Sequence, residues 1–250
     1  MPHRNHSSQN HLAGVRIAIT GGTSGLGLAL VREWNSHGAR VAFVARTQEK
    51  VERIAREIPG TEGVVGDVSN KQDIHPIALQ ILGRLGGLDV LVNNASSLGP
   101  VPLALLADTE CEHFETALAT NLLGPFRLTK ALLGALRSSA AEGRGAVVLN
   151  ISSDAAVTPY SRWGAYGASK AALHHMSAIW RTELENEGIR VLSLDPGDMD
   201  TPLHELAVPD ADPSTLRKPK ESARELTRSI VAELRDIGSL HHRKPETHAA

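Results

Sequence analysis

Short apolar runs alternate along the chain with longer segments whose apolar residues recur at helical spacing. The runs end at glycine or polar residues and predict strands, whereas the longer segments predict helices. Strands are expected at Val15–Thr20, Arg40–Ala45, Gly63–Val65, Leu88–Val92, Ala146–Ile151 and Ile189–Leu194. Helices are expected at Gly25–His37, Gln48–Glu57, Lys71–Leu85, Glu110–Ser138, Tyr166–Asn186 and Glu221–Asp236. Repeated strand–helix units of this length predict a parallel sheet covered by helices on both faces.

This alternation is unbroken, and it predicts one doubly wound α/β domain over residues 12–237. No stretch has the composition of a domain linker, and no segment repeats at the spacing of a solenoid. Residues 1–11 and 238–250 are polar, so we expect both ends to be flexible.

Charge and hydropathy exclude several classes of protein. The chain has 26 Lys and Arg against 28 Asp and Glu and no long basic block, so no nucleic-acid partner is expected. No run of about 18 apolar residues is present to span a membrane. The polar, His-rich start lacks the apolar stretch of a signal peptide. We therefore expect a soluble, cytoplasmic protein.

Metal chemistry is also not expected. Cys111 is the only cysteine, so one chain can form neither a disulfide nor a thiolate cage for a metal. The twelve histidines form no convincing ligand cluster with a carboxylate.

A glycine-rich turn joins the first predicted strand to the first predicted helix, with the pattern T-G-x-x-x-G-x-G. Glycines let backbone amides approach a pyrophosphate, and the helix N-terminus adds positive potential. The more general G-x-G-x-x-G pattern is not met, and a tight turn that binds no ligand is the alternative. The residues expected to contact the phosphates are Gly21, Thr23, Ser24, Gly25, Leu26 and Gly27.

Arg46 ends the second predicted strand, where an acidic residue would bind a ribose 2′-hydroxyl. Arginine at this position favours a 2′-phosphate, because it can form a bidentate, charge-assisted contact. The predicted cofactor is therefore NADP(H) rather than NAD(H), with an ordinary surface arginine as the alternative.

Tyr166 and Lys170 are four residues apart, so they share one face of a predicted helix, and Ser153 lies at the end of the preceding strand. Tyrosine titrates near pH 10, and lowering its pKa by about two to three units requires roughly 3–4 kcal/mol of preference for the phenolate. A lysine cation about 4 Å away in a partly screened site supplies about 4 kcal/mol. We expect Lys170 to lower the pKa of Tyr166, and Ser153 to hold the substrate oxygen.

The motifs together resemble the short-chain dehydrogenase/reductase family, in its shorter, single-domain class. The resemblance covers about Leu12 to Ile237 and rests on Thr20-Gly21-x-x-x-Gly25-x-Gly27, Asn93-Asn94-Ala95, Asn121, Ser153, Tyr166-x-x-x-Lys170 and Pro196-Gly197. It implies a Rossmann-like sheet, a nicotinamide cofactor and Ser–Tyr–Lys catalysis assisted by an asparagine. By position, Ser153 would orient the substrate, Tyr166 would be the general acid or base, and Lys170 would bind ribose and tune Tyr166.

The same resemblance implies further cofactor contacts. Asp67 and Val68 would contact adenine, Asn94 and Ala95 would line the cofactor, and Pro196, Gly197 and Thr201 would flank the nicotinamide. Ser96 stands where the family has glycine. Each of these segments could also be a simple turn.

Asn121 is expected in a helical stretch, four residues before Pro125. The N–H that would normally bond the Asn121 carbonyl is missing, because proline has none. We therefore predict a kink and a free carbonyl. In the resembled family, this carbonyl holds a water molecule that links the lysine to solvent. A structural kink without function is the alternative.

The predicted substrate contacts are Ser153, Tyr160, Trp163 and Met199, with Leu98 and Leu203 as neighbours, which suggests a pocket with apolar walls. Residues 198–218 should shape this pocket, but they carry no signature of a particular substrate.

The C-terminal end departs from the resembled family, in which a further strand follows the last helix and supports one tetramer interface. Here a polar end follows, so the final strand is expected to be absent or very short. We therefore predict a homodimer through the helices that contain Asn121 and Tyr166.

The sequence favours an NADP(H)-dependent oxidoreductase that interconverts a small-molecule carbonyl and an alcohol by hydride transfer. A catalytically idle NADP(H)-binding regulatory protein of the same fold is the alternative. A sugar-nucleotide epimerase or dehydratase shares the Tyr–Lys pair, but such enzymes are usually longer and have a different glycine spacing.

Overall fold

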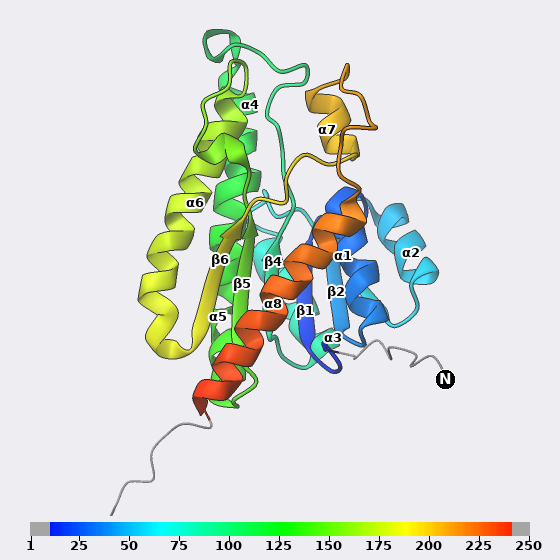
Figure 1. Ribbon diagram of the computed structural model, residues 1–250, viewed down its shortest axis with the longest axis vertical. Helices are drawn as coiled ribbons and strands as arrows, with labels where there is room; N and C mark the ends of the chain where they lie inside the picture. The colour runs from blue at the N-terminus through cyan, green and yellow to red at the C-terminus, as the bar shows by residue number, and fades with distance from the viewer. Residues whose placement is uncertain (1–10, 242–250) are drawn as a thin grey trace, which may run out of the picture.

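Six parallel strands form one sheet at the centre of a single domain, as seen in the computed structural model (Figure 1), which describes residues 11–241. The strands are β1 (Arg16–Thr20), β2 (Arg40–Ala45), β3 (Thr61–Val65), β4 (Val90–Asn93), β5 (Ala146–Ile151) and β6 (Ile189–Leu194). Their order in the sheet is β3-β2-β1-β4-β5-β6. The chain therefore reverses direction across the sheet between β1 and β4, which is where doubly wound folds bind their ligands.

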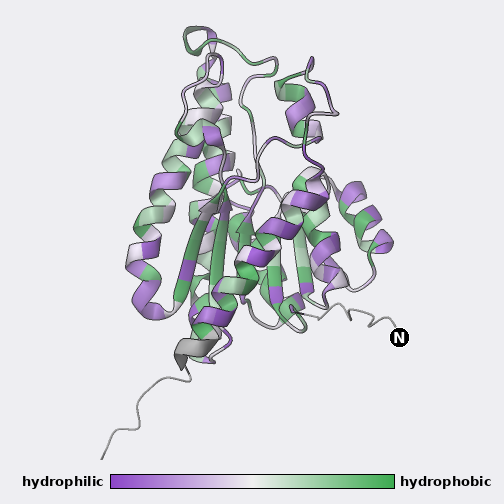
Figure 2. Cartoon of the chain, viewed as in Figure 1, coloured by the Kyte–Doolittle hydropathy of each residue, from purple (hydrophilic) through white to green (hydrophobic). Residues whose placement is uncertain are grey.

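Helices cover both faces of this sheet (Figure 1). The α-helices are α1 (Gly25–Ser36), α2 (Gln48–Glu57), α3 (Ile74–Leu85), α4 (Cys111–Leu118), α5 (Gly124–Ala141), α6 (Gly164–Leu184), α7 (Pro202–Ala207) and α8 (Pro219–His241). One apolar core joins α1, α2 and α8 to the sheet, and a second joins α3, α5 and α6 to its other face. Because both faces are covered, the strands are mostly apolar, as the hydropathy colouring in Figure 2 shows.

The predicted doubly wound sheet is confirmed, and most strand positions agree to within a few residues. The third helix begins at Ile74 rather than Lys71, because polar side chains form a turn before it. In this turn, the Asp67 carboxylate accepts from the Ser69 N–H at 2.9 Å, and Asp73 accepts from the Asp67 N–H at 2.9 Å. Such local bonds compete with helix formation.

The long helix expected over Glu110–Ser138 is divided into three parts. Between α4 and α5, residues Ala119–Leu123 form a π-helical turn, η2, in which the Gly124 N–H bonds the Ala119 carbonyl five residues back. Pro125 follows this turn and cannot donate a backbone hydrogen bond to Asn121. A π-turn therefore lies where the sequence predicted a kink, while the kink and the free carbonyl of Asn121 stay predictions.

The chain end differs from the expected boundary at residue 237, because α8 continues to His241. The final strand predicted to be absent or very short would follow α8, so this prediction concerns residues outside the described part of the chain and stays a prediction. Residues 1–10 and 242–250, which hold most of the ends expected to be flexible, lie outside the described residues. None of the described helices is long and apolar enough to cross a membrane.

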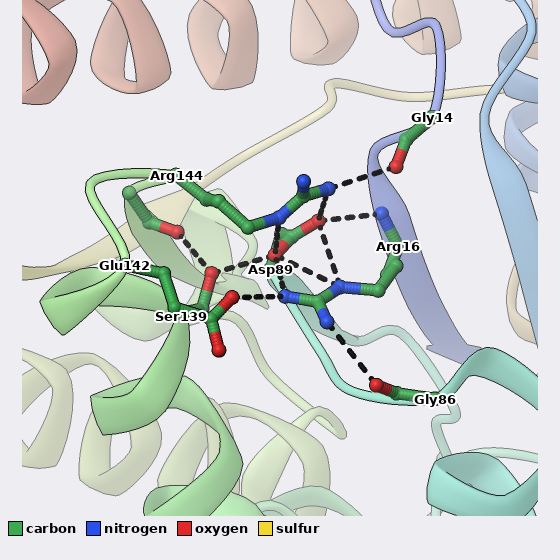
Figure 3. Close-up of polar contacts among 8 residues, drawn as sticks. Gly14, Arg16, Gly86, Asp89, Ser139, Glu142 and Arg144 are labelled. Carbon is green, nitrogen blue, oxygen red and sulfur yellow. Dashed lines mark hydrogen bonds and ion pairs between the residues drawn. The ribbon is translucent and has the colours of Figure 1, made fainter.

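A buried carboxylate ties together the edge of the sheet where the strands begin (Figure 3). Asp89, just before β4, is 1% exposed and accepts from the guanidinium groups of Arg16 at 2.6 Å and Arg144 at 3.0 Å. The Ser139 hydroxyl, on α5, donates to it at 2.6 Å, and the Arg16 N–H donates at 2.8 Å. This cluster connects β1, β4 and the end of α5 at the edge opposite the predicted site.

Candidate active site

A cleft of about 910 Å³ lies at the carboxyl edge of the sheet, among the loops that follow the strands and α7. It is lined by every predicted contact except Asn121, namely Gly21, Thr23, Ser24, Gly25, Leu26, Gly27, Arg46, Asp67, Val68, Asn94, Ala95, Ser153, Tyr160, Trp163, Tyr166, Lys170, Pro196, Gly197, Met199 and Thr201. The sequence motifs, far apart in the chain, therefore meet in one cavity.

The glycine turn after β1 is held closely against the loop after β4. The Thr20 hydroxyl accepts from the N–H groups of Asn94 and Ala95, both at 3.0 Å, and the Asn94 amide donates to the Thr20 carbonyl at 2.9 Å. Gly21 has a φ of +72°, and a Cβ at Gly27 would overlap the Gly21 carbonyl. The turn can therefore keep this shape only with glycine at these positions.

The start of α1 is suited to an anion. Ser24, which precedes the helix, makes no side-chain capping bond, and the first turn contains no acidic residue. The free N–H groups and the helix dipole therefore face the cleft without a protein anion to satisfy them. This arrangement fits the pyrophosphate of a dinucleotide.

Cationic side chains lie at the end of the cleft beside β2. Arg46 follows β2, and Lys50, in the first turn of α2, lines the same cavity. Lys50 was not predicted from the sequence, although a second cation in the first turn of the helix after Arg46 could have indicated it. This end of the cleft has the charge that a phosphate group requires.

The three predicted catalytic side chains meet beyond the glycine turn. Ser153 follows β5, whereas Tyr166 and Lys170 lie on α6 and are 8% and 2% exposed. The Lys170 ammonium donates to the carbonyl of Ile151 at 2.7 Å and lies 5.5 Å from the centre of the Tyr166 ring. Serine, phenol and ammonium are therefore close enough to act on one substrate.

The expected lowering of the Tyr166 pKa is not found. Burial raises the pKa of Tyr166 to about 12, and hydrogen bonding with Ser153 only partly opposes this rise. Burial also lowers the pKa of Lys170 to about 8. The reason for the difference is that Lys170 is directed to the Ile151 carbonyl, while the phenol is desolvated.

A carboxylate that the sequence reasoning missed contacts Ser153. The Ser153 hydroxyl donates to Asp154 Oδ1 at 3.0 Å, and the Tyr160 hydroxyl donates to Asp154 Oδ2 at 2.6 Å. The bond from Tyr160 is the main cause that holds the pKa of Asp154 below its ordinary value. An acidic residue directly after the predicted serine was the available signal in the sequence.

Asn121 is fully buried and does not line the cleft. Its side chain accepts from the Ser97 N–H at 2.8 Å, and it donates to the Ser97 carbonyl and the Ser169 hydroxyl, both at 2.8 Å. These bonds fix the loop after β4 against α6. The Asn121 side chain therefore positions the two elements that carry the cleft wall and Tyr166.

The substrate end of the cleft has a mixed wall. Trp163 packs edge-on against Tyr166, with 5.5 Å between ring centres, and Leu98 and Leu203 pack beside them. Asp154 and other polar side chains also line this end, so the expectation of apolar walls is only half right. The short helix α7, which the sequence did not predict, also lines this end of the cleft. The Thr201 hydroxyl caps the start of α7 by accepting a hydrogen bond from the His204 N–H.

Metal-binding geometry does not occur within residues 11–241, where no group of three or more His, Cys, Asp or Glu side chains could hold an ion. The one buried side-chain N or O atom without a hydrogen-bond partner in this part of the chain is Nδ1 of His204, on α7.

Comparison with known proteins matches the sequence of this chain to one family. Residues 16–212 match the family described as short chain dehydrogenase. The chain is 34% identical to an L-fucose dehydrogenase of Mus musculus over 202 aligned residues. The aligned region covers 80% of this chain and 71% of that protein.

Solved structures share the fold. A 3-ketoacyl-(acyl-carrier-protein) reductase from Brucella melitensis, complexed with NADH, superposes with a TM-score of 0.80 at 28% identity, over 86% of this chain and 90% of that one. An actinorhodin polyketide ketoreductase with NADPH superposes with a TM-score of 0.77 at 26% identity, over 86% and 90% of the two chains.

Proposed function

The chain belongs to the short-chain dehydrogenase family, and on this basis we propose that it is an NADP(H)-dependent oxidoreductase that interconverts a carbonyl and an alcohol. The observation that carries the proposal is the continuity of one cleft, which extends from the glycine turn and Arg46 to Ser153, Tyr166 and Lys170. Oxidoreductase chemistry on alcohol or carbonyl groups follows from the family, whereas the cofactor and the residue roles are proposals.

The dinucleotide would lie along the carboxyl edge of the sheet. The turn Gly21–Gly27 would hold the pyrophosphate, and Arg46 would bind a 2′-phosphate, with Lys50 as a second cation. Asp67 and Val68 would contact the adenine, and Asn94 and Ala95 would line the cofactor. Pro196, Gly197 and Thr201 would lie beside the nicotinamide, which supplies or accepts the hydride.

Tyr166 is proposed as the general acid and base. Its raised pKa of about 12 keeps the phenol protonated at neutral pH in the free protein, which is the form needed to donate a proton to a carbonyl oxygen. Ser153 would donate a second hydrogen bond to this oxygen, and Lys170 would bind ribose and favour the phenolate once it forms. Asn121 would act by holding the loop after β4 and α6 in register.

The proposal is tested by replacing Tyr166 with phenylalanine, which removes the hydroxyl and keeps the ring. The rate of NADPH consumption with ketones, quinones, steroids and sugars identifies accepted substrates. We expect kcat/KM to fall on the order of 10²- to 10⁴-fold in the variant, with cofactor affinity retained. Full activity of Tyr166→Phe on every accepted substrate would refute the assigned role.

Cofactor choice is tested separately with Arg46→Ala. A charge-assisted hydrogen bond contributes about 1.5–3 kcal/mol, so the preference for NADPH over NADH should fall about 10- to 100-fold. The catalytic rate at saturating cofactor should change little, because Arg46 lies far along the cleft from Tyr166. An equal preference in both proteins would show that Arg46 does not select the cofactor.

A catalytically idle NADP(H)-binding protein is the second candidate. Such a protein would need the glycine turn and the cations beside β2 but not Ser153, Tyr166 and Lys170 together, so the complete set in the cleft argues against it. Binding of NADPH without turnover of any substrate, equal in the wild-type protein and in Tyr166→Phe, would support this candidate.

We further propose a homodimer through α4, α5 and α6. The apolar side chains of Phe126 and Ile179 are exposed on these helices, and Phe126 packs edge-on against Trp180. A stable tetramer in light scattering would contradict this proposal. The cytoplasmic location expected from the sequence stays a prediction.

A further inference from the structure

Ser153, the residue proposed to hold the reacting oxygen, has its single proton engaged by a neighbour. An ionised carboxylate can only accept hydrogen bonds, so in the 3.0 Å contact with Asp154 Oδ1 the serine must be the donor. A hydroxyl group has one proton, and Ser153 cannot donate to Asp154 and to a substrate oxygen at once.

Asp154 is ionised at neutral pH. The hydrogen bond from Tyr160 is the first cause that lowers its pKa, and the bond from Ser153 acts in the same direction. Oδ1 also accepts from the Ala155 N–H at 2.7 Å, and Oδ2 accepts from Tyr160 at 2.6 Å. When the Ser153 hydroxyl turns to a substrate, Asp154 Oδ1 therefore keeps the hydrogen bond from the Ala155 N–H and loses the one from Ser153.

A substrate hydroxyl can replace the lost donor. Asp154 Oδ1 lies 3.0 Å from the Ser153 oxygen, so a group that contacts Oδ1 would be attached next to the carbon that carries the reacting oxygen. Such a hydroxyl would restore the second bond to Oδ1 while Ser153 donates to the reacting oxygen. A substrate without it would leave an acceptor of Asp154 to be satisfied by water alone.

Charge at this end of the cleft argues against an anionic group at the same position. Asp154, Asp195 and Asp198 all line it, and the first two each raise the pKa of Tyr166 by their negative charge. Asp198 acts in the same direction on Tyr160. The substrate end is therefore surrounded by carboxylates.

Few cations offset these carboxylates among the described residues of the wall. Arg46 and Lys50 lie at the other end, beside β2, and Lys170 is buried and donates to the Ile151 carbonyl. A substrate carboxylate or phosphate beside Ser153 would therefore meet repulsion without a partner.

We propose that the substrate carries a neutral hydroxyl on the carbon adjacent to the reacting carbon, and that Asp154 binds this hydroxyl in exchange for Ser153. The preferred substrates are thus α-hydroxy ketones and the corresponding vicinal diols, and α-keto acids are rejected. This inference rests on the proposed function, because it places the reacting oxygen at Ser153.

Three matched ketones test the proposal: 2-hydroxyacetophenone, acetophenone and phenylglyoxylate, which differ only in the group beside the carbonyl. We expect wild-type kcat/KM to favour the hydroxyketone over acetophenone by about 10- to 100-fold, the range for a hydrogen bond to a charged group. Phenylglyoxylate should be slower than the hydroxyketone by about 100-fold or more.

Two variants of Asp154 separate its hydrogen bond from its charge. Asp154→Ala should abolish the preference for the hydroxyketone over acetophenone. Asp154→Asn keeps an acceptor without the charge, so it should retain part of that preference and raise the rate with phenylglyoxylate at least about 10-fold. Glu205→Gln, an equal charge change on the exposed side of α7 outside the cleft, should leave all three ratios unchanged.

Dissociation constants of the same ketones, measured by calorimetry with the protein saturated with NADP⁺, give a readout that needs no turnover. The proposal is supported if the protein binds the hydroxyketone more tightly than acetophenone and phenylglyoxylate, and if Asp154→Ala loses this preference. If this result is found but no ketone is reduced, only the proposed function fails. Equal rates and affinities for hydroxyketone and acetophenone, or ratios unchanged in Asp154→Ala, overturn it whether or not the protein is active.

Discussion

Replacement of Asp89 by asparagine tests whether the buried cluster at the amino edge of the sheet stabilises the fold. Asp89 is 1% exposed and is bound by Arg16, Arg144 and Ser139 (Figure 3). Asparagine has nearly the same shape but no charge, so the two guanidinium groups would lose their shared partner. Removing one member of a buried ion pair costs about 3–5 kcal/mol.

For a domain of this size, that loss should lower Tm by about 6–20 °C. Urea unfolding at pH 7 would measure it directly, with Glu142→Gln as the control. Glu142 lies 3.7 Å from the Arg16 guanidinium but is largely exposed, so its replacement should cost about 1 kcal/mol or less. A free energy of unfolding for Asp89→Asn within 1 kcal/mol of the wild type would refute the assigned role.

The pH dependence gives a second test of the same cluster. Burial alone would raise the pKa of Asp89, but hydrogen bonds from Arg144, Arg16 and Ser139 hold it far below the ordinary value of about 3.9. A lowered folded-state pKa stabilises the protein fully above the unfolded-state pKa, and this stabilisation is lost as the pH falls toward the folded-state value. Between pH 7 and pH 3, the advantage of wild type over Asp89→Asn should shrink by about 1.3 kcal/mol.

Three other predictions follow from the cleft and the helices. Gly27→Ala should weaken NADPH binding at least about 10-fold in a fluorescence titration, whereas Gly83→Ala, where a Cβ meets nothing within 4 Å, should not. Because burial lowers the pKa of Lys170 to about 8, the lysine loses its charge as the pH rises through that value. The kcat/KM for NADPH should therefore decline above pH 8, and a flat profile to pH 9.5 would contradict this. Phe126→Glu should convert a dimer to a monomer in light scattering, while Leu79→Glu, an exposed residue on α3, should leave it intact.

The sheet could be predicted from the sequence because its physical signal is local. A strand buried on both faces must be apolar along its length, so runs such as Ala146–Ile151 are visible without any tertiary information. The glycine turn is visible for a related reason, since the close approach of Gly27 to Gly21 permits no side chain. Both features depend on residues that are close together in the chain.

The features that escaped prediction depend on contacts between distant segments or on short local bonds. Pro125 predicts a break at Asn121 but not its form: the structure has a π-turn, η2, in which the Asn121 side chain bonds Ser97 and Ser169. The helix α7 has only six residues, too few for a periodic pattern, and it begins where Thr201 caps it.

The pKa of Tyr166 was predicted to be lowered, and this prediction is wrong for a different reason. The spacing of Tyr166 and Lys170 on one helix correctly predicts that they are neighbours, but it contains nothing about desolvation or about the direction of the ammonium. Lys170 bonds the Ile151 carbonyl instead, and burial then dominates the phenol. The spacing in the sequence therefore predicts that the two side chains are neighbours, but not whether the pKa of Tyr166 is raised or lowered.

Two carboxylates show how the two edges of this sheet differ. Asp89, where the strands begin, is bound by two guanidinium groups, a hydroxyl and a backbone N–H, so it has no capacity left for a ligand. Asp154, where the strands end, is exposed and holds Ser153 by a bond that a substrate can exchange. In a parallel sheet all strands begin at one edge and end at the other, so stability and substrate selection can be set by different residues. Substitutions at Asp89 should accordingly change the free energy of unfolding without changing substrate ratios, whereas substitutions at Asp154 should change substrate ratios and cost less stability, because Asp154 is exposed.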